Sequence, residues 1–211
     1  MQRMLVVSLI GLVLAGCQPP VAPEVLHQWQ SRTLYTCCNI HYEGSKVNDA
    51  NYYVGSMLPF GSSAAVVKMA GNSVTVRSGA TELTLEHSYG KDQESDQQYF
   101  SKVLVETDPH VRFATYPKQV QEAVSEGRVE VGMTKEQVIM SLGYPPTHRT
   151  ASTDLNTWTY WYNRWITYQV QFGADGKVSM LVGNAPTRNE PIVAPTPTPA
   201  KVPARRGRSK K

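Results

Sequence analysis

The amino-acid sequence predicts an α+β protein: a small β-rich region with one helix precedes a sandwich of two helices on a three-stranded antiparallel sheet. Two capped amphipathic helices are expected between residues 116 and 143, and three segments of alternating apolar residues follow up to residue 182. Helices followed by an antiparallel meander bury their apolar faces against each other as a two-layer sandwich. Residues 31–110 carry shorter apolar runs separated by turn residues, which indicates a separate β-rich unit.

The β-rich unit is expected to contain strands and one helix. The alternating runs predict strands over residues 33–42, 64–69, 73–77 and 82–87, with a turn at Gly71 and Asn72. A helix is expected over residues 92–106, because Tyr99 and Val103 lie four residues apart on one stripe, as helix packing requires. Pro109 ends it.

The two later helices carry start and stop signals. Pro117 suits the first helical position of one, and Gly127 is placed to end it. Thr134 and Gln137 predict a capping box at the start of the other helix. Gly143 is placed to end that helix. Further residues support these positions: Val120, Ala123, Val124, Val138 and Leu142 as the buried stripes, Met133 with Val138 as a hydrophobic staple, and Pro145 and Pro146 as helix breakers.

Three strands are expected over residues 157–162, 165–172 and 177–182. Alternation assigns one buried face to each strand: Trp158, Tyr160 and Tyr162; Ile166, Tyr168, Val170 and Phe172; and Val178, Met180 and Val182. Trp161 and Trp165 fall on the opposite face, on either side of a tight turn. They are either a docking surface for a partner or lipid headgroups, or they pack against the β-rich unit.

The N-terminus has the order of a secretory signal, with Arg3, an apolar run over residues 4–14, and small residues at Ala15 and Gly16. The run is too short to span a bilayer. Leu14-Ala15-Gly16-Cys17 resembles the lipobox of bacterial lipoproteins. The resemblance implies a signal peptide over residues 1–16, acylation of Cys17 and a lipidated tether over residues 17–30 that holds the protein on the outer membrane at its periplasmic face. The alternative is an ordinary cleaved signal followed by an incidental cysteine.

Residues 185–211 are proline-rich and carry a net charge of +6, whereas residues 17–184 carry −3. A segment of this composition cannot bury enough apolar surface to fold, so it is expected to be a disordered tail. Its basic cluster consists of Arg205, Arg206, Arg208, Lys210 and Lys211. We expect this cluster to meet anionic lipid or peptidoglycan, or to act as a solvated spacer without a partner. An exported lipoprotein meets no cytoplasmic nucleic acid, so no nucleic-acid partner is expected.

Catalytic and metal chemistry have little support. The five histidines lie in no recognised catalytic or metal-binding frame, so no enzyme activity and no cofactor are expected. Cys37, Cys38 and His41 are the one set that looks like metal ligands, but they lack a second ligand pair. A pair of strand cysteines that face opposite sides is favoured, and pairing with each other or between chains is the alternative.

Several motifs in the predicted sandwich resemble those of a known protein family. Val131-Gly132-Met133-Thr134-Lys135-Glu136-Gln137-Val138, Leu142-Gly143, Pro145, Asn156-Thr157-Trp158, Tyr160, Phe172 and Gly176-Lys177-Val178 are similar to the SmpA/OmlA domain of BamE, a lipoprotein of the outer-membrane β-barrel assembly machinery. The likeness covers about residues 116–183. It implies the two-helix, three-strand fold also seen in β-lactamase inhibitory protein.

The resemblance also implies a function. We expect an outer-membrane lipoprotein that acts as a non-catalytic adaptor in envelope or β-barrel protein assembly, with assembly subunits as partners. Two alternatives remain: a structural link between membrane and cell wall through the basic tail, and an inhibitor-like protein-binding module. The added β-rich unit and the tail depart from the family pattern.

Overall fold

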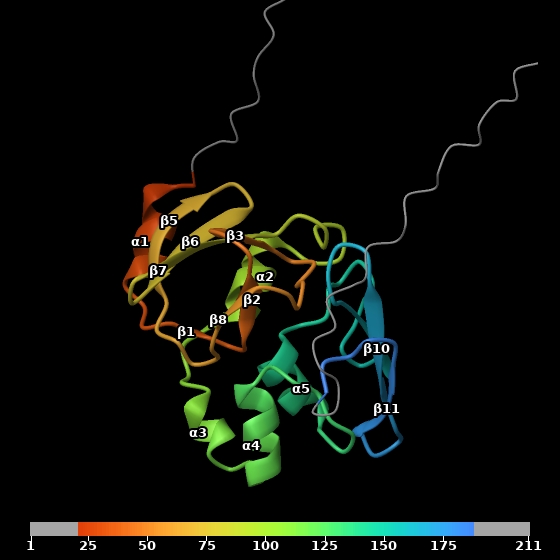
Figure 1. Ribbon diagram of the computed structural model, residues 1–211. Helices are drawn as coiled ribbons and strands as arrows, with labels where there is room; N and C mark the ends of the chain where they lie inside the picture. The colour runs from red at the N-terminus through yellow and green to blue at the C-terminus, as the bar shows by residue number, and fades with distance from the viewer. Residues whose placement is uncertain (1–20, 188–211) are drawn as a thin grey trace, which may run out of the picture.

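The computed structural model describes residues 21–187 (Figure 1). Their buried apolar side chains form two clusters: the first cluster includes Trp29, Val74 and Leu83, and the second cluster includes Val138, Leu142 and Trp158. In chain order the elements are α1 (Pro23–Gln30), β1 (Tyr35–Thr36), β2 (Ile40–Tyr42), β3 (Lys46–Asn48), β4 (Ser56–Leu58), β5 (Ala65–Ala70), β6 (Ser73–Ser78), β7 (Thr81–Glu86), α2 (Asp96–Val103), β8 (Leu104–Val105), α3 (His110–Phe113), α4 (Lys118–Ser125), α5 (Lys135–Leu142), β9 (Thr157–Trp161), β10 (Thr167–Phe172) and β11 (Val178–Val182). The mixture of helices with mainly antiparallel sheets confirms the α+β class. We call the parts before and after residue 115 the N-terminal and C-terminal halves.

The N-terminal half is built on a four-stranded sheet in the order β3-β7-β6-β5. β5, β6 and β7 pair antiparallel through tight turns, and β3 adds in parallel to β7. These three antiparallel strands confirm the segments expected at 64–69, 73–77 and 82–87. Val74, Val76, Leu83 and Leu85 are buried in one cluster with Phe100 of α2, so the alternation of apolar residues determines which face of the sheet carries the core.

Two predicted elements of this half are shorter than expected. The single strand expected over 33–42 is two strands, because the disulfide-bonded pair Cys37–Cys38 turns the chain between β1 and β2. The helix expected over 92–106 begins only after Ser95, where Ser95 and Gln98 form a capping box. It ends at Val103, because the next two residues pair with β1 as β8.

The prediction of a lipidated tether over residues 17–30 is wrong from Pro23 onward. Pro23 begins α1, which suits a residue whose φ is already helical and whose missing N–H costs nothing at that position. Trp29 of α1 is buried in the first cluster, and α1 packs against β5. Burial of this indole favours an ordered helix over an extended tether.

The two helices of the C-terminal half occur where they were expected. α4 follows Pro117, and the capping box of α5 forms from Thr134 and Gln137. Gly143 ends α5 with φ of +79°, a conformation that favours glycine. Val138 and Leu142 are buried together with Trp158, which places both helices on the sheet as predicted.

The sheet of this half has the order β11-β10-β9, and Figure 1 shows β10 and β11 beside α5. Trp158, Tyr160, Tyr168, Val170 and Phe172 face the helices and are buried. The two-helix, three-strand sandwich is therefore confirmed.

The buried face predicted for the last strand, β11, is wrong. Met180 and Val182 were expected to be buried with Val178, but Met180 is 54% exposed. The pairing shifts at β11, because Phe172 pairs with Val178 while Gln171 pairs with Met180, which leaves Ser179 as an extra residue. Such a bulge reverses the alternation beyond it. Leu181 packs against the core instead.

The tail begins later than expected. Ala185 is buried in the second cluster, and the Pro186 carbonyl accepts a hydrogen bond of 2.8 Å from the Val129 amide. The prediction of a disordered tail from residue 185 is therefore wrong for its first residues, because these residues complete the core. Its remainder, residues 188–211, lies outside the described residues.

Candidate binding surface

The junction between the two halves is built around Asn39, which directly follows the disulfide. Its side-chain amide donates to the carbonyl oxygens of Val124 at 2.7 Å and Ser141 at 3.0 Å, and its backbone amide donates to Met140 at 3.1 Å. These carbonyls lie in the last turns of α4 and α5, where the helix itself supplies no donor. Asn39 is 1% exposed, so one buried residue of the N-terminal half caps both helices of the C-terminal half.

Asn51 makes a second cap across the junction. Its side-chain amide donates to the carbonyls of Leu142 at 2.7 Å and Tyr144 at 3.0 Å. A Cβ atom at Gly143 would lie 2.8 Å from this amide nitrogen, so the glycine permits the close approach. Phe60 of the N-terminal half is also buried in the second cluster. The end of the helical layer is therefore occupied by the chain's own N-terminal half.

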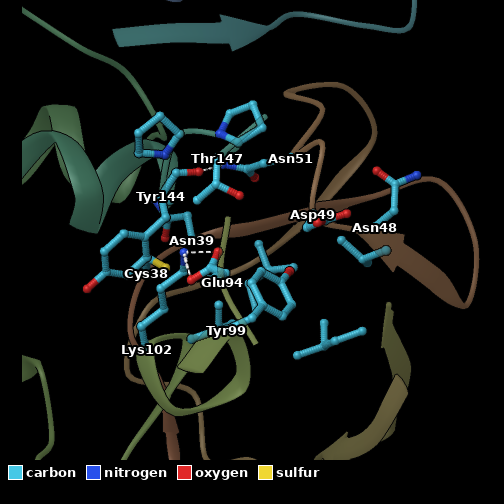
Figure 2. A pocket seen from close by; sticks show the side chains of 17 residues that line it. Cys38, Asn39, Asn48, Asp49, Asn51, Glu94, Tyr99, Lys102, Tyr144 and Thr147 are labelled. Atoms are coloured by element: carbon cyan, nitrogen blue, oxygen red, sulfur yellow. Dashed lines mark hydrogen bonds and ion pairs between the residues drawn. The ribbon is translucent and has the colours of Figure 1, made fainter. Parts of the chain in front are cut away.

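The cleft beside this junction is small (Figure 2). Figure 2 shows Asn39, Glu94, Lys102 and Tyr144 around it, and its volume is about 30 Å³. A water molecule needs roughly 10–15 Å³ of such volume, so the cleft holds about two waters. The Lys102 ammonium is bound to the Glu94 carboxylate at 2.7 Å and lies over the Tyr144 ring. The cleft is a packed polar junction that has no room for a substrate.

The strongest cluster of titratable groups near this cleft is structural. His87 is completely buried, stacks on Tyr99, and shares a hydrogen bond of 2.7 Å with Asp96. On its other side lies the buried Asp49, whose carboxylate accepts hydrogen bonds from the backbone amides of residues 88–90. These contacts fix the loop after β7. The imidazole is not accessible to a substrate.

An open hollow lies beneath the hairpin that joins β9 and β10, and it shares Val47 and Asn48 of its lining with that cleft. It measures about 450 Å³, within the usual size range of ligand sites. Its lining combines aromatic, cationic and amide side chains from the hairpin and from the segments around β2 and β3, among them Tyr42, Lys46, Tyr52, Asn163, Arg164 and Trp165. We call this site the hairpin hollow.

Trp165 stands at the rim of the hairpin hollow on an ordered turn. The Asn163 side-chain oxygen accepts hydrogen bonds from the backbone amides of Trp165 at 2.9 Å and Ile166 at 3.0 Å. The indole is nevertheless 82% exposed. An aromatic side chain held on a rigid turn loses little conformational entropy when it docks, and tryptophan is enriched at the energetic centres of interfaces.

Trp161 has a different environment, although the sequence grouped it with Trp165. It is half-buried, it meets the Tyr52 ring edge-on at 6.4 Å, and its carbonyl accepts a hydrogen bond from the Tyr53 amide. The Arg149 guanidinium lies 5.4 Å from its ring centre. The structure thus separates the two tryptophans: Trp161 packs against the N-terminal half and Trp165 projects from the surface.

His41 lines the hairpin hollow and is buried. Within residues 21–187 neither ring nitrogen has a hydrogen-bond partner, and the ring lies 4.5 Å from that of Tyr53. Burial lowers the pKa of His41 to about 4, because the charged imidazolium loses its hydration. At neutral pH the ring is therefore uncharged.

The two described cysteines are bonded to each other and are not available to a metal. Cys37 and Cys38 form a disulfide between β1 and β2, so they do not face opposite sides of one strand as favoured from sequence. The turn between the two strands brings the neighbouring thiols together. Among the described residues, no group of three or more His, Cys, Asp or Glu side chains is placed to bind a metal ion.

The remaining residues singled out in the sequence, Cys17 and the basic cluster Arg205, Arg206, Arg208, Lys210 and Lys211, lie outside the described residues. Within residues 21–187, no helix is long and apolar enough to cross a membrane. Sequence reasoning missed Asn39, Asn51 and Arg164. The two asparagines follow or precede short strands without any periodic pattern, and only the folded junction gives them a role.

Comparison with known proteins identifies one part of the chain. Residues 121–180 match the family model described as the outer membrane protein assembly factor BamE domain. The match covers α4 from Gln121, α5 and most of the sheet, which confirms the resemblance seen in the sequence. No curated protein and no solved structure matches the chain.

Proposed function

Because residues 121–180 match an outer-membrane assembly factor domain, we propose that this chain is a lipid-anchored, non-catalytic docking protein for β-barrel assembly at the periplasmic face of the outer membrane. The match is the observation that carries the proposal. The geometry supports it in two ways: the imidazole of His87, between Asp49 and Asp96, is buried and structural, and the exposed Trp165 projects from the matched domain.

The anchor proposed is an acylated Cys17. Only residues 18–22 separate Cys17 from the first residue of α1. The six residue steps from Cys17 to Pro23 span at most about 20–22 Å, so the lipid would hold the folded part close to the membrane. Membrane attachment raises the effective concentration of the protein toward membrane-bound partners.

The proposed docking surface is the hairpin hollow with its rim. The N-terminal half already covers the ends of α4 and α5 through Asn39 and Asn51, so a partner would approach from the sheet side. Trp165 and Arg164 lie adjacent on the hairpin, and tryptophan and arginine are typical of residues that dominate binding energy. The basic cluster from Arg205 to Lys211 would add a weaker, salt-sensitive contact to anionic lipid or peptidoglycan.

Two variants test the proposal. Cys17→Ser should leave the protein unprocessed and outside the outer-membrane fraction, as measured by fractionation and mass spectrometry of the N-terminal residue. Normal acylation and outer-membrane location of this variant would contradict the anchor.

Co-purification from gently solubilised membranes tests the docking role. The unaltered chain should recover β-barrel assembly subunits, and Trp165→Ala should lower that recovery. Leu155→Ala is the matched control, because Leu155 is an exposed apolar residue on a different loop. Absence of assembly subunits from the material recovered with the unaltered chain would contradict the docking role.

A further inference from the structure

The hairpin hollow has the lining of a site for proline-rich peptide. Trp165, Tyr52 and Tyr42 contribute aromatic rings, and Arg164 and Lys46 contribute hydrogen-bond donors. Proline-rich segments favour the extended polyproline II helix, whose rings pack on aromatic side chains and whose carbonyls need outside donors. Grooves lined by aromatic residues recognise such segments in several peptide-binding modules. The Lys46 ammonium is bound to the Glu86 carboxylate at 2.7 Å, so the Arg164 guanidinium is the cationic donor that the hollow offers to a peptide carbonyl.

The chain carries such a segment itself. Residues 191–199 read Pro-Ile-Val-Ala-Pro-Thr-Pro-Thr-Pro, with prolines at 191, 195, 197 and 199. They begin four residues after Thr187, the last described residue. A polyproline II segment rises about 3.1 Å per residue, so one that started at Thr187 would reach at most about 12 Å by residue 191 and about 37 Å by residue 199.

The described chain ends near residues that contact the lining of the hollow. A Cβ atom at Gly183 would lie 3.2 Å from the carbonyl oxygen of Thr167, two residues from Trp165. The Pro186 carbonyl then binds the amide of Val129 at 2.8 Å. Gly127, two residues earlier, lies next to His41: a Cβ atom there would be 3.1 Å from the imidazole, which lines the hollow. The end of the chain and the hollow are thus joined by short contacts.

We propose that the hairpin hollow binds residues 191–199 of the same chain, with Trp165 packed against the proline rings. Residues 191–199 carry no charged side chain, so the association depends on packing of the proline rings against the aromatic side chains of the hollow. Affinity need not be high: a short tether gives an effective concentration on the order of millimolar. The bound segment covers the exposed indole and holds the basic cluster beyond residue 204 near the hairpin.

Tryptophan fluorescence tests this contact directly. Trp29 and Trp158 are buried and Trp161 is half-buried, so Trp165 dominates quenching by acrylamide. The full chain should show emission shifted to shorter wavelength and less quenching than a chain that ends at Thr187, both in the same mild detergent. Replacing Pro191, Pro195, Pro197 and Pro199 with alanine in the full chain should give the emission of the shortened chain. Equal emission and equal quenching in the full and shortened chains would overturn the proposal.

A labelled peptide of residues 188–204 provides a second measurement. It should bind the shortened chain, measured by fluorescence anisotropy, and Trp165→Ala should abolish that binding while Leu155→Ala leaves it unchanged. Equal binding to the Trp165→Ala variant would remove the hollow as the site. These measurements use the purified chain alone, so their failure is distinct from failure of the docking role. The consequence for docking rests on the proposed function: the tail would compete with the partner, and its removal should increase recovery of assembly subunits.

Discussion

The side-chain amide of Asn39 donates a hydrogen bond of 2.7 Å to the carbonyl oxygen of Val124, across the junction of the two halves. The same amide also reaches Ser141 in α5, so one side chain ties two helix ends to the N-terminal half. The domain that matches the assembly factor family is therefore completed by a segment far outside the match.

Asn39→Ala should lower the free energy of unfolding by about 3 kcal/mol, because the Ser141 carbonyl loses its side-chain donor and the buried Phe60 amide loses its acceptor. Urea denaturation of the two proteins measures the difference. Asn156→Ala is the control, because Asn156 is exposed, and it should cost less than about 0.5 kcal/mol. Equal costs for the two variants would show that the helix ends do not depend on Asn39.

Leu142→Ala should cost about 2–5 kcal/mol of unfolding free energy, as truncation of a buried leucine does. Leu142 is 3% exposed in the second cluster, whereas Leu155 is 49% exposed. Leu155→Ala makes the same chemical change and should cost little. Thermal or urea unfolding compares them, and a Leu155→Ala loss as large as that of Leu142→Ala would place the core of this half elsewhere.

Alanine substitutions at two glycines distinguish the stability cost of backbone strain from that of a steric clash. Gly143 and Gly176 both have positive φ, so alanine at either should cost about 1–2 kcal/mol. At Gly176 an added Cβ meets nothing within 4 Å, but at Gly143 it would lie 2.8 Å from the Asn51 amide. Gly143→Ala should therefore be the more destabilising change. The unfolding midpoints of the two variants measure this difference. An equal loss of stability in Gly176→Ala and Gly143→Ala would contradict a steric contribution at Gly143.

Stability should fall as the pH is lowered from about 6.5 to 4, because burial lowers the pKa of His41 to about 4 from its ordinary 6.5. In this window the unfolded chain binds a proton that the folded protein excludes, so the unfolding free energy rises with pH by up to about 3 kcal/mol. His41→Gln should flatten this part of the curve. Burial also lowers the pKa of His148, which contributes in the same direction in both proteins. An unchanged pH profile in His41→Gln would contradict the buried neutral state.

The sequence correctly predicted the elements that depend on interactions between residues close together in the chain. The capping box at Thr134 and Gln137, the glycine at 143 and the alternation from Trp158 to Phe172 each depend on residues a few positions apart, and all appear in the fold. The same local physics placed Trp165 outside the core.

The sequence predictions were wrong where contacts between residues distant in the chain determine the structure. Met180 faces outward because of a bulge that only the register with β10 reveals. The segment predicted as a tether contains a helix, because Trp29 is buried in the first cluster. Asn39 and Asn51 carry no periodic signal, because their partners lie 85 to 102 and 91 to 93 residues away.

Site-specific cross-linking in growing cells tests the docking role most directly. A photo-reactive phenylalanine analogue would replace Trp165 in one strain and Leu155 in another, with the rest of the chain intact. The account predicts that irradiation joins position 165, and not position 155, to a subunit of the β-barrel assembly machinery. The absence of such an adduct at position 165, or equal adducts at both positions, would contradict it.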